Sequence, residues 1–307
     1  MKKYRLFRSL LALALAAGLT LPTALAAQSA PPEATPAVVT PKAPVESQLL
    51  SDMHIEAAAA ILVDADTGTV LFDQNAHEQR YPASITKILT ALLIIENKQM
   101  TDTVTFGEHA VSESIPGNAR INVQLGETIT VEDALHAILL ASANEVCTQL
   151  AIDIAGSEEG FAAMMNERAA ALGCTNTHFV NANGLPDDDH YTTIYDMYLI
   201  FQAAIQTQDF IDIIHTQSYD AAYQNVSGNT VTQTWESTNR YLNGQTTEPE
   251  DITVIGGKTG TTNAAGYCLV LYSKNKKGDD IVSIVYKGKT RSDMYTLMNQ
   301  ILSTFAN

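Results

Sequence analysis

The sequence predicts a mixed α/β fold of the α+β kind, with one antiparallel sheet built from both ends of the chain and flanked by helices. Apolar runs typical of strands occur at residues 58–63 and 69–72, and again at 267–272 and 281–286. The stretch between them has helix-like spacing of apolar residues. Strands so far apart share a sheet only if the middle of the chain packs against it. We therefore expect a helical lobe on the sheet, with a site in the seam.

The first 26 residues have the pattern of a secretory signal peptide. Basic residues precede an apolar run at 10–21, and Ala24-Leu25-Ala26 provides the small side chains of a cleavage site. This run is shorter than the roughly 20 apolar residues that a membrane-spanning helix needs. We therefore expect cleavage and export, with an uncleaved N-terminal anchor as the alternative.

The next segment, residues 27–50, is rich in alanine, proline and threonine and predicts a disordered linker, followed by one domain over 51–307. The chain has 18 Lys+Arg and 34 Asp+Glu. Four of the basic and none of the acidic residues fall in 1–26, which leaves a formal charge of 14 minus 34, or −20. Such acidity argues against nucleic acid or an anionic membrane as a partner.

The three cysteines are Cys147, Cys174 and Cys268. They lie far apart without CxxC spacing, so they allow at most one disulfide. We interpret them as small buried hydrophobic residues.

The first half of the domain is predicted to begin with a β-hairpin, in which residues 64–68 form the turn. A helix then begins at Ser84. Another begins after Thr130, with Asp133 at the capping-box position. Residues 145–172 are predicted to be helical throughout.

The second half changes from helix to strand. Residues 193–206 are predicted to be helical, and the polar stretch 217–250 is predicted to form turns and short strands. Residues 274–280 join the last two strands as a second hairpin. An amphipathic helix over 294–305 closes the chain.

Three short motifs suggest a chemistry: Ser84-Ile85-Thr86-Lys87, Ser142-Ala143-Asn144 and Lys258-Thr259-Gly260. A serine hydroxyl is a weak nucleophile at neutral pH, so a base must take its proton. A lysine serves as that base only if burial or nearby cations lower its pKa. Ser84 and Lys87 are three residues apart, on one face of a helix. The spacing therefore predicts a serine nucleophile with a lysine base.

Each motif alone is weak, because the chain repeats two of them. Ser273 with Lys276 has the first spacing, and residues 227–229 and 237–239 have the second. Context separates the sets, since Ser84 stands where a helix begins and its own N–H can serve an oxyanion.

The remaining motif residues receive roles from their chemistry. We expect Ser142 to relay a proton toward a leaving amine, and Asn144 to accept a hydrogen bond from Lys87 while donating to a substrate carbonyl. Lys258 is expected to offer an ammonium to a substrate carboxylate and to lower the pKa of Lys87 by repulsion. The N–H of Thr261 is expected to complete the oxyanion hole.

The order of the three motifs resembles that in class A β-lactamases and penicillin-binding proteins. Over roughly residues 55–305, the chain resembles the D-alanyl-D-alanine carboxypeptidases, which are low-molecular-weight penicillin-binding proteins of the β-lactamase-like superfamily. The segments that carry this resemblance are 81–87, 126–133, 176–179, 190–197, 238–240 and 257–268.

The resemblance implies a β-lactamase/transpeptidase-like fold and an enzyme of the cell-wall side of a bacterial membrane. The implied substrate is a peptidoglycan stem peptide ending in D-Ala-D-Ala, cleaved through an acyl-enzyme on Ser84 that penicillins also form. No cofactor or metal is implied. The implied substrate-binding residues are Lys258, Thr259, Gly260, Thr261 and Arg291, the last for the terminal carboxylate. The alternative for Arg291 is a solvated cation at a helix start.

The chain departs from the family pattern at several positions. Ala143 stands where glycine is usual, Asn183 where histidine is usual, and Thr261 where an aromatic residue or histidine is common. Many members carry a C-terminal β-rich domain, which is not expected in residues 51–307.

Three further functions stay open at this point, a β-lactamase, a D,D-endopeptidase and an inactive wall-binding scaffold. A class A β-lactamase needs a glutamate for deacylation in a loop after the second motif. Residues 174–190 contain none, so we expect a long-lived penicilloyl adduct. A metal enzyme is disfavoured because the seven histidines lack HxxxH or HxxEH spacing. His190 is interpreted as part of a solvated acidic loop.

Overall fold

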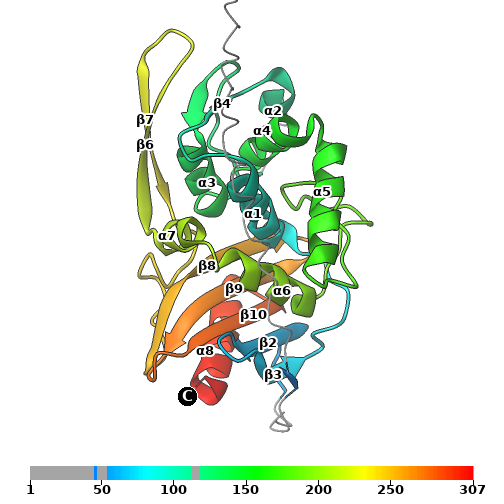
Figure 1. Ribbon diagram of the computed structural model, residues 1–307. Helices are drawn as coiled ribbons and strands as arrows, with labels where there is room; N and C mark the ends of the chain where they lie inside the picture. Colours follow the sequence, from blue (N-terminus) through cyan, green and yellow to red (C-terminus); the bar gives the residue numbers. More distant parts are fainter. Residues whose placement is uncertain (1–44, 47–53, 113–117, 307) are drawn as a thin grey trace, which may run out of the picture. The chain divides into compact units, whose positions relative to one another are not determined.

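The computed structural model describes residues 45–46, 54–112 and 118–306, which form two sheets and the helices around them (Figure 1). The larger sheet contains, in spatial order, β1 (Val45–Glu46), β3 (Thr69–Gln74), β2 (Ala59–Asp64), β10 (Asp280–Gly288), β9 (Gly266–Asn275) and β8 (Ile252–Thr262).

The two ends of the domain meet in the middle of this sheet. β2 pairs antiparallel with β10, and Ile61 lies opposite Ile284. The predicted sheet is therefore confirmed, with one exception to its antiparallel pattern, because β1 pairs parallel with β3. β1 falls within the predicted linker. The rest of that linker and the predicted signal peptide lie outside the described residues.

The larger sheet is buried on both faces. Along β9, Cys268 and Val270 face one apolar cluster, whereas Leu269 and Leu271 face another. This alternation is that of a strand covered on both sides. Helix α8 (Arg291–Phe305) packs on one face, and α6 (Ile194–Ala204) packs on the other (Figure 1).

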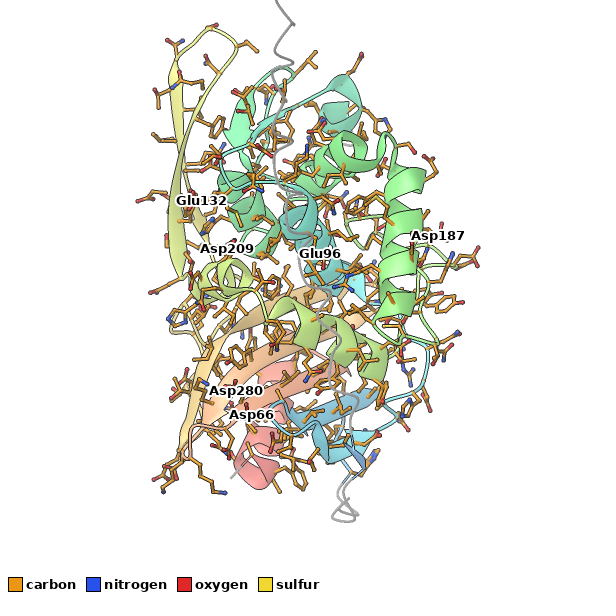
Figure 2. All side chains as sticks on the ribbon, in the orientation of Figure 1. Asp66, Glu96, Glu132, Asp187, Asp209 and Asp280 are labelled. Carbon is orange, nitrogen blue, oxygen red and sulfur yellow. The ribbon has the colours of Figure 1, made fainter. Side chains whose placement is uncertain are left out.

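The helical lobe surrounds α1 (Lys87–Asn97), which follows directly from the 3₁₀ turn η1 (Ala83–Thr86). An ion pair of 2.7 Å joins Glu96 of α1 to Arg168 of α5 (Glu158–Ala171), and Figure 2 shows Glu96 on the inner helix. The other helices of the lobe are α2 (Glu108–Ser112), α3 (Val131–Leu139), α4 (Asn144–Ala155), α5 (Glu158–Ala171) and α7 (Gln208–His215).

The smaller sheet lies at the edge of the helical lobe. It consists of β4 (Thr103–Thr105), β5 (Thr128–Thr130), β6 (Ser218–Gln224) and β7 (Thr230–Glu236). The predicted capping box is confirmed, since the Thr130 side chain accepts from the Asp133 N–H and the Asp133 carboxylate accepts from the Thr130 N–H.

One prediction about the elements was wrong, and one helix was missed. Residues 145–172 form two helices, because Gly156 adopts a φ of 80° and ends α4, and the Ser157 side chain caps α5. Helix α7 was not predicted, because it lies between the helix expected over 193–206 and the polar stretch 217–250.

Cys147 and Cys268 are buried as expected, whereas Cys174 is only partly buried. Among the residues that the structure describes, no helix combines the length and the apolar character that crossing a membrane requires.

Candidate active site

Ser84 and Lys87 meet at the junction of η1 and α1. The Lys87 side chain is fully buried, and its Nζ lies 3.1 Å from Ser84 Oγ and 2.7 Å from Asn144 Oδ1. The Nζ also donates to the backbone carbonyl of Asn183. Three segments far apart in the sequence therefore converge on one amine.

The partners of Lys87 determine which atoms remain free for chemistry. A neutral amine has two N–H donors and one lone pair. The carbonyl oxygens of Asn144 and Asn183 only accept, so they occupy both donors. The lone pair of neutral Lys87 then faces the hydroxyl of Ser84, which is the geometry that a general base requires.

Burial lowers the pKa of Lys87 to about 8. The carboxylate of Glu145 and the thiol of Cys147 act in the opposite direction. Loss of solvation thus accounts for the lowered pKa of Lys87, and the repulsion expected from Lys258 is not among its causes.

Lys258 lies inside β8, the edge strand of the larger sheet. Its Nζ is 3.2 Å from Ser142 Oγ and 3.0 Å from the carbonyl oxygen of Thr259. Burial lowers the pKa of Lys258 to about 7, and the charge of Lys87 adds to the effect. The structure thus places the second lysine against the second serine.

Backbone strain gathers around the two serines. Ala83 has a φ of 50° and Ser142 has a φ of 62°, both in the left-handed region that non-glycine residues avoid. Ala143, the departure from the family pattern, has an ordinary φ of −60°. Its Cβ is accommodated without strain, and the unusual conformation lies one residue earlier.

A cavity of about 360 Å³ opens between the helical side and the strand side of the site. Lys87 and Lys258 lie behind its wall, each bonded to a serine that lines it. Arg291, at the exposed start of α8, also lines the cavity. The predicted residues in the wall are Ser84, Ser142, Asn144, Thr259, Gly260, Thr261 and Arg291.

Sequence reasoning missed several contributors to this cavity. The Asn183 carbonyl was not recognised as a partner of Lys87. Thr238, which belongs to a repeat of the second motif, lines the cavity, and its hydroxyl lies 2.7 Å from that of Thr259. Asn118 also lines it. A backbone acceptor leaves no mark on residue identity, so the sequence carried no signal for the first.

The interpretation of His190 as a solvated residue was wrong. Its side chain is buried, and its Nδ1 accepts from the Val180 N–H at 3.2 Å. Nε2 therefore carries the proton and donates to Thr86 Oγ1 at 2.9 Å. Burial lowers the pKa of His190 to about 4, so the ring is neutral and ties this loop to η1.

The same loop approaches η1 closely at Gly184. Its φ is 82°, and a Cβ there would lie 1.9 Å from the carbonyl oxygen of Ala83. Only glycine permits this approach. The contact and the His190 bond together hold the Asn183 carbonyl against Lys87.

The chain is similar to known enzymes over most of the domain. Residues 43–290 match the family model peptidase S11, described as D-alanyl-D-alanine carboxypeptidase. The carboxypeptidase DacF of Bacillus subtilis is 34% identical over 82% of this chain and 62% of its own length. DacC of Escherichia coli is 32% identical over 81% and 61%. The chain thus spans about three fifths of the length of these curated relatives.

The solved structures agree with the family match. The Streptomyces K15 DD-transpeptidase superposes with a TM-score of 0.73 at 26% identity, over 81% of this chain and 98% of that one. This likeness confirms the predicted β-lactamase/transpeptidase-like fold. The chain belongs to the D-alanyl-D-alanine carboxypeptidase family, peptidase S11.

Proposed function

We propose that this chain is a serine D,D-carboxypeptidase that removes the terminal D-Ala from peptidoglycan stem peptides ending in D-Ala-D-Ala. The observation that carries the proposal is the position of Lys87 Nζ, 3.1 Å from Ser84 Oγ with two carbonyl acceptors on its other sides. Ser84 Oγ attacks the carbonyl carbon between the two D-alanines while neutral Lys87 takes its proton. The N–H groups of Ser84 and Thr261 hold the oxyanion.

The departing D-Ala leaves on the side of Ser142 and Lys258. The Ser142 hydroxyl passes a proton to the leaving amine, and its contact with Lys258 Nζ at 3.2 Å supports a relay between them. The terminal carboxylate binds near Thr259 and Arg291, whose hydroxyl and guanidinium line the cavity, and near Lys258, which lies behind the wall against Ser142. Water then hydrolyses the acyl-enzyme.

Penicillins acylate Ser84 and leave it slowly. No carboxylate side chain occurs among the described residues that line the cavity. A class A β-lactamase depends on such a group to activate water. The penicilloyl adduct is therefore long-lived, which favours the peptidase over a β-lactamase. This activity is assigned to the cell-wall side of a bacterial membrane, after export of the chain.

The direct test is mass spectrometry of a stem pentapeptide before and after incubation with the full chain. Loss of one alanine is expected, and Ser84→Ala abolishes both this loss and labelling by fluorescent penicillin. Unchanged release by Ser84→Ala would refute the assigned nucleophile. Faster turnover of penicillin than of peptide would identify a β-lactamase instead, and cleavage of cross-linked dimers alone would identify an endopeptidase.

A further inference from the structure

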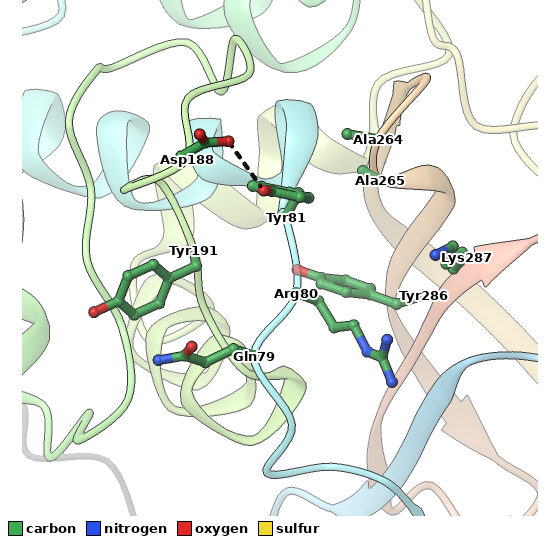
Figure 3. Close-up of a pocket in the computed structure, with 9 residues that line it drawn as sticks. All are labelled: Gln79, Arg80, Tyr81, Asp188, Tyr191, Ala264, Ala265, Tyr286 and Lys287. Atoms are coloured by element: carbon green, nitrogen blue, oxygen red, sulfur yellow. Dashed lines mark hydrogen bonds between the residues drawn. The ribbon is translucent and has the colours of Figure 1, made fainter.

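A second cavity, of about 270 Å³, lies beside the candidate active site and has no role in the reaction described above. Figure 3 shows the segment of Arg80 and Tyr81 at its centre, with Asp188 on one side and Tyr286 and Lys287 on the other. The Tyr81 hydroxyl donates to Asp188 Oδ1 at 3.4 Å.

Three segments of the chain line both cavities. Tyr81, Asp188 and Ala264 line the second cavity. Each of them lies two or three residues along the chain from a residue that lines the active-site cavity, and these neighbours are Ser84, Leu185 and Thr262, respectively. The second cavity thus lies near the first, along the same three segments and past the end of β8.

The second cavity contains polar groups that the protein leaves unsatisfied. The hydroxyl of Tyr286 is buried, since only 1% of the residue is exposed, and it has no hydrogen-bond partner among the described residues. Arg80 pairs with Glu78 through one amino group, but its buried Nε has no partner in the described part of the chain. A buried donor without a partner costs stability, so a group that accepts from it gains by binding.

The charge of the lining favours an anion. Among the described residues that line it, Arg80 and Lys287 are the cations and Asp188, which accepts from Tyr81, is the acid. Glu78, the ion-pair partner of Arg80, is not part of the lining. Two cations together are notable in a chain with a net charge of −16. Guanidinium, ammonium and phenol groups are all donors, which is the set that a carboxylate requires.

The direction of the substrate decides which part of it reaches this cavity. Under the proposed function, the leaving D-Ala lies toward Lys258, so the acyl half of the peptide runs along the free edge of β8 toward Thr262. Ala264 lies three residues beyond Thr261, at most about 10 Å along an extended strand. The residue before the two D-alanines, with a long side chain, spans that distance.

We propose that the second cavity is a specificity subsite for a free carboxylate on the side chain of the residue that precedes D-Ala-D-Ala. Arg80 and Lys287 bind the carboxylate, and the Tyr286 hydroxyl donates to it. The inference rests on the proposed function for the direction of the peptide. The subsite would give the enzyme a preference among stem peptides, which the catalytic residues around Ser84 do not provide.

The test compares two stem pentapeptides that differ only in this group. One carries meso-diaminopimelate at the third position, and the other carries its carboxamide, which has the same shape without the charge. Calorimetry with Ser84→Ala measures both dissociation constants without turnover. We expect about tenfold tighter binding of the free carboxylate, the value of one charge-assisted hydrogen bond.

The variants Lys287→Met and Arg80→Met, each in the Ser84→Ala chain, are expected to bring the two dissociation constants within about twofold of each other, because the charge-assisted bond is lost. Lys289→Met is the matched control, since it removes the same charge two residues away, outside the lining, and keeps the preference. Equal binding of both peptides by Ser84→Ala, or a preference that survives both variants, would overturn the subsite. Absence of D-Ala release from either peptide by the wild type would instead contradict the proposed reaction.

Discussion

The helical side and the strand side of the site bury one lysine each, and they hold it differently. Lys87, on the helical side, has three partners fixed by three separate segments. Lys258, on the strand side, contacts Ser142 and the carbonyl of its own neighbour, Thr259. Burial lowers the pKa of both. The difference therefore lies in the acceptors around them rather than in their solvation.

This difference supports the two roles that we propose for the same residue type. An amine whose N–H donors are occupied by fixed carbonyls presents its lone pair, and it acts as a base. An amine with fewer acceptors keeps N–H donors for an incoming anion. Four experiments test whether the two lysines differ in this way.

The largest effect is expected for Lys87→Met, which removes the base but keeps the length of the side chain. Acylation of Ser84 should slow by about 10³-fold, within the range for loss of a general base. Stopped-flow mixing with fluorescent penicillin measures the rate. A fall below about tenfold would show that another group takes the proton, because general-base loss costs more than that.

A smaller and more selective effect is expected for Lys258→Met. Release of D-Ala should fall by about 30-fold in kcat/KM, the value of one hydrogen bond between charged groups. A peptide whose terminal carboxylate is amidated serves as the control and should lose much less. Equal losses for the two peptides would contradict the assignment of Lys258 to the carboxylate.

The pH dependence of kcat/KM separates the two lysines. In the proposed mechanism Lys87 acts only as the neutral amine, so the rate should fall as the pH drops below its pKa of about 8. Lys258 is proposed to act only as the ammonium, so the rate should also fall as the pH rises above its pKa of about 7. The profile should be a bell with its maximum between these values and limbs of about tenfold per pH unit. Lys258→Met should lose the alkaline limb, and a Lys258→Met profile that keeps this limb would assign it to another group.

The smallest effect on the reaction rate is expected when one of two glycines is replaced by alanine. These substitutions should instead change the free energy of unfolding. Gly184→Ala places a Cβ against the Ala83 carbonyl at a φ of 82° and should cost about 3 kcal/mol of unfolding free energy, from strain and overpacking. Gly228→Ala, at a φ of 75° with no atom within 4 Å, should cost about 1 kcal/mol. Urea unfolding measures both, and equal costs would mean that the loop moves away freely.

Much of the fold could be predicted because it depends on local patterns. The two hairpins, the Thr130 capping box and the closing helix each have a signal within a few residues. The break between α4 and α5 was missed, although Gly156 and Ser157 supply an ordinary helix stop and start. A long apolar helical pattern on both sides concealed them.

The candidate site also has features that the sequence could predict and features that it could not. The residue types at Ser84, Lys87, Ser142, Asn144 and Lys258 predicted the kind of chemistry that we propose, because side-chain identity and spacing carry that information. Only the tertiary structure decided that the Asn183 carbonyl completes the surroundings of Lys87, that His190 is a buried neutral support, and that Arg80 and Lys287 share a second cavity. Those properties arise when segments far apart in the sequence come into contact and lose water. Neither the contacts nor the loss of solvation could be predicted from the sequence alone.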